Sequence, residues 1–194
     1  MPLSSWQALG TGDVLGHLRA DLKKASSSVW VIGPWIDEFF AQVLVTALPA
    51  STALYVVTRP PSGANSSFGE HALSARASLE ARPNTVVKLL VNLHAKVIVV
   101  DEQIGYCGSA NWYRYSLEES REIVLRGPVA STSGLLDEVQ VIWEQAEDAQ
   151  PVQRSLTTRS AANGYTKEVI DPVAEAKLKE VPGSFVLNRK PRRR

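Results

Sequence analysis

The chain has 194 residues, of which 44% are hydrophobic, and this is enough for one compact domain with its own core plus an appendage. The single cysteine, Cys107, excludes an internal disulfide and a cysteine-rich metal site, and no run of about 18 apolar residues is present to span a membrane. The first residues lack a basic leader followed by an apolar block, so we expect a soluble, cytoplasmic protein.

The net charge of +1 conceals a division along the chain. Residues 151–194 carry ten Lys/Arg and four Asp/Glu, a charge of +6, whereas residues 1–150 carry eleven and sixteen, a charge of −5. We therefore predict a folded domain over 1–150 and a basic carboxy-terminal extension over 151–194 that is partly ordered or docks on the domain. A basic tail can hold a polyanion near a site, but terminal basic runs are often only solvated, and charge alone does not decide between the two.

Helical and strand patterns alternate along the first half of the domain. Apolar spacing and turn residues predict a short turn at 6–9, a helix over 13–25, a buried strand over 29–33, a helix between its cap Asp37 and Pro49, a buried strand over 53–58 and a helix over 66–81. This rhythm is typical of a sheet covered by helices on its faces.

Four β-rich runs follow, and after them an amphipathic helix. The strands are predicted at 85–91, 94–100, 104–107 and 122–125, and the helix over 135–146, capped near 131–133. Beyond Pro151 the pattern fades to a short helix over 174–181 and a strand over 184–188. We therefore predict an α/β fold in which a mixed central sheet, with the four later strands at its centre, is sandwiched by helices.

One stretch, residues 94–111, reads HAKVIVVDEQIGYCGSAN and holds most of the side chains that suit chemistry. It contains H-x-K-x4-D and then G-S-x-N, formed by His94, Lys96, Asp101, Gly108, Ser109 and Asn111. Residues two apart on a strand point to the same face, so we expect His94 and Lys96 to project into one site. By itself this pair could lie in solvent at a strand end, but chance would place H-x-K-x4-D in only about one such chain in 200.

The stretch resembles the HKD signature of the phospholipase D superfamily, H-x-K-x4-D-x6-G-S-x-N, and matches it at every defined position. Glu122 lies eleven residues past Asn111, where that family often carries the partner of its histidine. The resemblance implies a phospholipase D-like fold with one HKD half per chain. It also implies phosphoryl chemistry, but it says little about the substrate.

The resemblance implies that His94 attacks phosphorus to give a phosphohistidine, and an imidazole with an ordinary pKa of about 6.5 suits this task near neutrality. Lys96, Ser109 and Asn111 then donate to the phosphoryl oxygens. No separate Asp/Glu/His cluster demands a metal, so we expect neither a metal nor another cofactor.

Three further residues have two interpretations each. Glu122 orients His94 through its second ring nitrogen, and Asp101 holds Lys96 or the local loop; either carboxylate could instead be a plain surface group. Gly108 lets the backbone pass close to the phosphate, or it marks a plain turn.

The family's site uses two HKD motifs, and this chain has one. Neither His17 nor His71 begins a second H-x-K. The economical solution is a two-fold homodimer, in which one copy of His94 attacks while the other protonates the leaving oxygen and then activates water. The resemblance is then to the small single-HKD members, which include phosphodiesterase nucleases and the nuclease domain of a metal-independent restriction enzyme.

The residues directly after Asn111 include Trp112 and Arg114, which suit a nucleic-acid groove but could equally belong to the core or to a dimer interface. The leading hypothesis is a metal-independent nuclease that acts on DNA in preference to RNA, in a restriction or anti-phage system. An alternative is a phospholipid-hydrolysing or phosphatidyl-transferring enzyme, against which the lack of a basic, aromatic amphipathic stretch counts. A second alternative is a catalytically silent nucleic-acid-binding subunit, against which the intact motif counts.

Overall fold

The computed structural model describes residues 4–61, 67–132 and 134–149. The predicted basic extension, with its helix over 174–181 and its strand over 184–188, lies outside the described residues.

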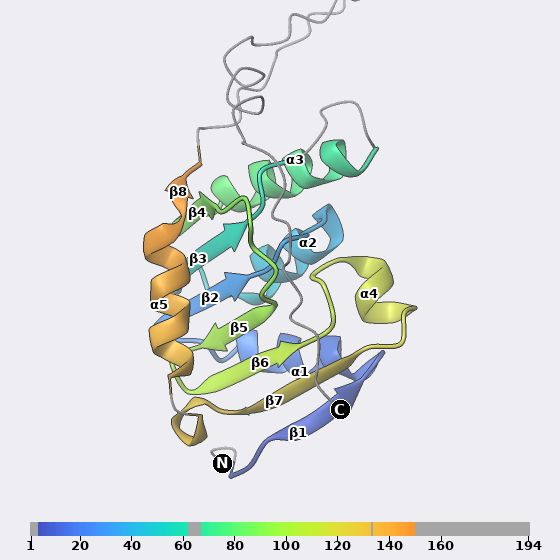
Figure 1. Ribbon diagram of the computed structural model, residues 1–194, viewed down its shortest axis with the longest axis vertical. Helices are drawn as coiled ribbons and strands as arrows, with labels where there is room; N and C mark the ends of the chain where they lie inside the picture. Colours follow the sequence, from blue (N-terminus) through green and yellow to red (C-terminus); the bar gives the residue numbers. More distant parts are fainter. Residues whose placement is uncertain (1–3, 62–66, 133, 150–194) are drawn as a thin grey trace, which may run out of the picture. The chain divides into compact units, whose positions relative to one another are not determined.

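One mixed sheet of eight strands organises the described part of the chain, in the order β1-β7-β6-β5-β2-β3-β4-β8 (Figure 1). The strands are β1 (Gln7–Gly10), β2 (Ser28–Ile32), β3 (Ala53–Thr58), β4 (Thr85–Leu89), β5 (Val97–Val100), β6 (Ile104–Gly108), β7 (Ile123–Pro128) and β8 (Glu147–Asp148). The two pairs β2–β3 and β3–β4 are parallel, and the other neighbours are antiparallel. The predicted mixed sheet is confirmed, but β2 and β5 are its central strands, whereas β4 and β7 lie one strand from its edges.

Helices cover both faces of this sheet, as the sequence predicts. The helices of the described residues are α1 (Asp13–Leu22), α2 (Glu38–Ala47), α3 (Ser67–Glu80), α4 (Arg114–Glu118) and α5 (Leu135–Gln145). Figure 1 shows α1, α2 and α3 on one face and α5 on the other. Helix α1 buries Val14, Leu18 and Leu22, which share one helical face, and the Asp37 carboxylate caps α2 by accepting from the Phe40 N–H at 2.8 Å.

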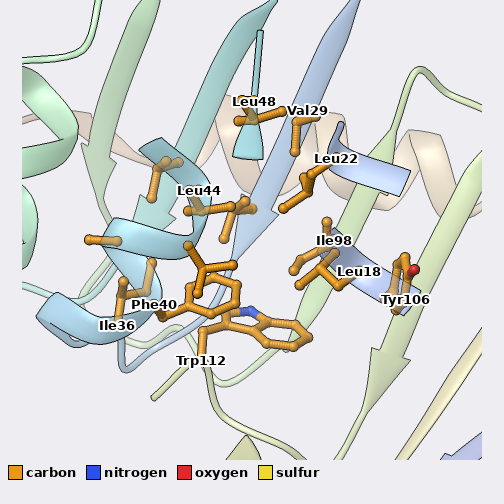
Figure 2. Packing of buried hydrophobic residues seen from close by; sticks show 14 of the residues in the cluster. Leu18, Leu22, Val29, Ile36, Phe40, Leu44, Leu48, Ile98, Tyr106 and Trp112 are labelled. Atoms are coloured by element: carbon orange, nitrogen blue, oxygen red, sulfur yellow. The ribbon is translucent and has the colours of Figure 1, made fainter. Parts of the chain in front are cut away.

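The larger core lies between the sheet and helices α1 and α2 (Figure 2). There Phe40 of α2 stacks on the ring of Trp112, with ring centroids 5.5 Å apart. On the other face, Val139 of α5 packs with Val57 of β3 and Val99 of β5. Because both faces of the central strands are buried, the ends of these strands are held in fixed positions for the loops that follow.

Three elements differ from the sequence prediction. The segment expected as a turn at 6–9 contains the edge strand β1, which pairs with β7, and α4 is an additional short helix. Strand β5 begins at Val97 and not at residue 94, since its partner β2 ends at Ile32 before Gly33 and Pro34. His94 and Lys96 therefore lie in the non-strand segment that leads into β5.

Strand direction brings seven strand ends to one end of the sheet. The carboxyl ends of β1, β2, β3, β4 and β6 meet the amino ends of β5 and β7 there, because Ile32 pairs with Val97, Val97 with Cys107, and Gly108 with Val124. We call this end the His94 edge. It lies where the β2, β3 and β6 arrows point in Figure 1.

Candidate active site

His94 and Lys96 lie directly before β5, at the His94 edge. The imidazole side chain of His94 is exposed, whereas Lys96 is only 9% exposed. The Lys96 Nζ donates to the main-chain carbonyl of His94 at 2.9 Å. This is the one acceptor for the ammonium among the described residues, so two of its three N–H groups stay available to a ligand.

The electrostatic environment of Lys96 combines burial with charges of both signs. Burial lowers the pKa of Lys96 below its ordinary value; the carboxylate of Glu122 opposes this shift, and the guanidinium of Arg59 adds to it. Both charged groups are thus close enough to act on the ammonium. An ammonium that is largely held out of water and contacts the main chain of His94 is well suited to neutralise charge on a phosphoryl group.

Ser109 and Glu122 are joined across the ends of β6 and β7. The Ser109 hydroxyl donates to Glu122 Oε2, and the Ser116 hydroxyl donates to Oε1 at 2.8 Å. The N–H of Glu122 in turn donates to the Thr11 hydroxyl at 3.0 Å. Two serines thus hold the carboxylate of Glu122, and Thr11, far away in sequence, holds its main chain.

This carboxylate stays ionised. Burial acts to raise the pKa of Glu122, but the pKa lies below its ordinary value because hydroxyl donors and a cation outweigh burial. The donors are the side chains of Ser109, Ser116 and Ser120, and the cation is Lys96. No hydrogen bond joins Glu122 to the His94 imidazole within the described ranges, so the orienting contact expected from the sequence is absent in this conformation.

Asn111 is fixed by the same serine. Its N–H donates to the Ser116 hydroxyl at 3.0 Å, and its side-chain Oδ1 is buried with no hydrogen-bond partner among the described residues. A buried amide oxygen without a donor costs free energy, and such groups are found at functional sites. The Asn111 amide is thus placed near the Ser109–Glu122 pair with hydrogen-bonding capacity to spare.

Trp112 is a core residue, so the predicted nucleic-acid contact is wrong for its side chain. It is 0% exposed, and its indole Nε1 donates to the Ile32 carbonyl at 2.8 Å. A Cβ on Gly33 would lie 2.2 Å from the indole, so only glycine leaves room for it. Figure 2 shows the ring below Phe40, in the core that anchors Asn111.

Gly108 allows two backbones to approach each other. A Cβ at this position would lie 2.2 Å from the Ile123 carbonyl oxygen of β7. The close approach at Gly108 is therefore between β6 and β7, and the Ser109 hydroxyl next to it donates to Glu122. The expected approach of this backbone to a phosphate stays a prediction.

Asp101 lies at the opposite end of β5 from Lys96. Its carboxylate accepts from the N–H groups of Ser26, Ser27 and Ser28 at 2.9, 2.8 and 3.1 Å, and from the Ser26 hydroxyl at 3.2 Å. Burial acts to raise the pKa of Asp101, but these hydrogen bonds lower it below the ordinary value. Of the two roles expected for Asp101, the structure gives the contact with a loop and no contact with Lys96.

Arg114 begins α4 and is exposed. Its guanidinium pairs with Glu118 at 2.9 Å and lies over the Phe39 ring at 5.1 Å, and its N–H donates to Asp37 at 2.9 Å. A role in nucleic-acid contact stays a prediction.

Sequence reasoning did not find Thr11, Ser116 or Arg59. Ser116 positions Asn111 and Glu122 from the short helix between them, and Thr11 holds the main chain of Glu122 from a segment far away in sequence. Arg59 acts on Lys96 from the end of β3. No spacing in the sequence relates these residues to the motif.

The described residues contain no group of three or more His, Cys, Asp or Glu side chains arranged to hold a metal ion. In the same part of the chain, no helix is both long and apolar enough to cross a membrane.

Comparison with known proteins places this arrangement in a family. Residues 18–142 match the family model described as the cardiolipin synthase, PLD-like domain. No curated protein sequence matches the chain.

Several solved structures share the fold. NucT from Helicobacter pylori has a TM-score of 0.61 at 20% sequence identity, over 75% of this chain and 100% of that chain. Nuc from Salmonella typhimurium, a phospholipase D family member, has a TM-score of 0.60 at 18% identity, over 75% of this chain and 98% of its own. Phosphatidylserine synthase from Haemophilus influenzae Rd KW20 has a TM-score of 0.55 at 11% identity, over 75% of this chain and 40% of that protein.

Identities this low show the fold alone, whereas the family model spans well over half of the chain. The matched residues include the complete His94–Asn111 motif on a mixed sheet flanked by helices. The chain therefore belongs to the phospholipase D-like family.

Proposed function

We propose that the protein is a metal-independent phosphodiesterase that cleaves nucleic acid through a phosphohistidine intermediate, in an active site shared by two copies of the chain. The observation that carries this proposal is the grouping at the His94 edge. The exposed His94 and the largely buried ammonium of Lys96 lie at one edge of the sheet, where the carboxylate of Glu122 acts on Lys96. Ser109 donates to the same carboxylate, and Ser116 joins it to the main chain of Asn111.

The reaction follows from these groups. A ring nitrogen of His94 attacks phosphorus, and the P–O bond to the leaving oxygen breaks while the His94 of the second copy gives that oxygen a proton. The His94 imidazole of the second copy then takes a proton from water, and the water oxygen attacks phosphorus. The P–N bond breaks, and this frees the His94 of the first copy. Lys96 and Asn111 donate to the phosphoryl oxygens in both steps.

The size of the matched domain supports a nuclease rather than a lipid enzyme. Nearly all of NucT and of Nuc corresponds to this one domain, whereas it covers 40% of phosphatidylserine synthase. The basic residues at 151–194 and the resemblance to single-HKD nucleases favour a polyanionic substrate, with DNA preferred over RNA. A role in a restriction or anti-phage system rests on family resemblance.

A second copy has a surface on which to dock. On the face that α5 covers, Trp6 lies over Gly127 of β7, but Ile123 and Leu125 of the same strand are 64% and 41% exposed. Both side chains point to this face, because the alternate residues Val124 and Arg126 are buried against the α1 side. Ile123 directly follows Glu122, so a partner seated here lies next to the His94 edge.

Phosphatidyl chemistry is the second candidate, favoured by the description of the matching family model and by the phosphatidylserine synthase fold. A phospholipid has a single phosphodiester, and His94 would attack its phosphorus in the same way. The substrate, and not the motif, distinguishes the two candidates.

The test is an assay of purified protein on single- and double-stranded DNA, RNA and a phosphatidylcholine analogue, all in EDTA. We expect DNA cleavage by the wild type and at least a 100-fold loss in His94→Ala. A single-turnover reaction quenched in base should trap phosphate on the wild-type chain, because phosphohistidine survives base. Lipid turnover without DNA cleavage would overturn the nuclease proposal, and nucleic-acid binding without turnover would favour a silent binding subunit.

A further inference from the structure

A cavity near the His94 edge has no role in the reaction above. It lies among the loops that follow β2 and β3 and helix α3, and its lining includes Trp35, Thr58, Arg59 and Arg76. With the open solvent at its mouth included it spans about 480 Å³, but the space that a water-sized group can enter is only about 20 Å³. The inner part thus has room for one water-sized group and not for a base or a nucleotide.

Two guanidinium groups line this cavity with donors that lack acceptors. The Nε of Arg59 is buried and has no partner among the described residues. Arg76 is 8% exposed; its Nε pairs with Glu80 Oε1 at 2.6 Å, whereas its buried Nη2 has no partner in the described part of the chain. Buried N–H groups without acceptors are costly, so the cavity is built to receive an acceptor.

The charge of the cavity is positive. The Arg76 charge is balanced by Glu80, but Arg59 takes part in none of the ion pairs that the described residues form. Instead its guanidinium lies over the Trp35 ring, 5.5 Å from the centroid. The Arg59 charge also acts on Lys96, so two cations face the same edge with one carboxylate, Glu122, near them. Like charges held this close favour a bound anion.

We propose that Arg59 and Arg76 form a second phosphate-binding subsite, which holds an oxygen of the phosphodiester next to the scissile one in a nucleic-acid strand. This inference rests on the proposed nuclease function. The planar forks of the guanidinium groups match phosphate oxygens, and the narrow inner cavity accepts one oxygen while the rest of the strand stays in the open mouth. A nucleic acid presents phosphates in series, so a site at Lys96 and a neighbouring site at Arg59 read two of them.

The test compares a substrate with many phosphodiesters to one with a single phosphodiester. The variants Arg59→Ala, Arg59→Lys and Arg76→Gln are assayed on a fluorescent oligothymidylate and on bis(p-nitrophenyl) phosphate, in EDTA. Arg19→Ala, on the exposed face of α1, removes the same charge elsewhere and is the matched control. Thermal melting of each variant checks that it is folded.

We expect Arg59→Ala to lower kcat/KM for the oligonucleotide about ten-fold more than for the single diester, mainly through KM. Arg59→Lys should recover part of this difference, and Arg19→Ala should change neither substrate. Equal losses on both substrates would overturn the subsite and place Arg59 at the scissile phosphate, and no loss on either would show that the cavity holds only water.

Failure of the nuclease function is recognised separately, when the wild type does not cleave the oligonucleotide at all. Binding then decides: in a His94→Ala background, fluorescence anisotropy measures the Kd of the oligothymidylate. A Kd that rises about ten-fold with Arg59→Ala supports the subsite, and an unchanged Kd overturns it.

Discussion

Two residues of one motif, Lys96 and Asp101, are five positions apart yet lie at opposite ends of β5. The extended geometry of a strand separates them, so they cannot share one phosphate. Lys96 faces the His94 edge with donors to spare, whereas the Asp101 carboxylate is used by the N–H groups of residues 26–28. The motif aspartate therefore acts on the loop before β2.

We predict that Asp101→Asn destabilises the fold but leaves catalysis by the folded protein unchanged. Asparagine accepts the φ of +51° at this position, yet its amide NH2 faces serine donors that need an acceptor. The expected loss is about 1–3 kcal/mol in the free energy of unfolding at pH 7, measured by urea denaturation. A loss of kcat in the folded variant would instead give Asp101 a part in the chemistry.

The pH dependence gives a second test of the same contact. The folded state lowers the pKa of Asp101, so its contribution to stability is present above the unfolded value of 3.8 and is lost as the pH falls through the lower folded value. The difference in stability between Asp101→Asn and the wild type should therefore shrink below about pH 3.8. A difference that stays constant down to pH 2 would contradict the hydrogen-bond account.

Strands β6 and β7 position Ser109 and Glu122 only because they can approach closely at Gly108. We predict that Gly108→Ala costs about 1–3 kcal/mol in stability, because the new Cβ would lie 2.2 Å from the Ile123 carbonyl. Activity should fall about 100-fold, since spreading the strands moves both side chains. Urea denaturation and DNA cleavage measure the two effects.

Gly16 supplies the control. It lies in the middle of α1, and a Cβ there would meet no atom within 4 Å. Gly16→Ala should raise stability by about 0.5–1 kcal/mol with activity unchanged, as expected for a helical glycine. If Gly108→Ala and Gly16→Ala changed stability and activity by the same amounts, the role of the β6–β7 contact would be contradicted.

Helices and strands were predicted well where their own residues determine them, and poorly where pairing with a distant strand does. Helices α1 and α5 and strands β2 and β3 were predicted well, because each carries its own apolar period between turn residues. Strand β1 was missed because QALG has no alternation and becomes a strand only by pairing with β7. The start of β5 was placed too early because that boundary is set by the end of its neighbour β2.

The residues of the candidate site likewise include some that the sequence predicted and some that it did not. The motif predicted that His94, Lys96, Ser109 and Asn111 would gather, and all four lie at the His94 edge. Contacts between distant segments, such as Thr11 with Glu122, left no trace in the spacing. The sequence left Trp112 undecided between a groove and the core, because an aromatic residue beside a motif suits both, and the structure places it in the core.

At the scale of the whole molecule, one chain supplies one motif histidine, His94, whereas the proposed reaction needs both a nucleophile and a proton donor. Helix α5 covers one part of its sheet face and leaves β7 open. An exposed apolar strand face beside a half site is the surface that a second copy should cover. The exposed face of β7 and the single HKD motif thus both favour the proposed dimer.

We predict that Leu125→Asp converts the wild-type dimer to a monomer and abolishes cleavage while the fold is retained. A buried carboxylate without a partner is costly in an apolar interface, whereas it is harmless on a free surface. Val86→Asp on β4 is the matched control, because Val86 is 42% exposed against 41% for Leu125 but lies near the other edge of the sheet. Sedimentation velocity should show a dimer for the wild type and for Val86→Asp. In a separate experiment, mixing the wild type with an excess of His94→Ala should lower the activity of the wild type, since a mixed dimer holds only one His94 imidazole. A fully active Leu125→Asp monomer would refute the shared site.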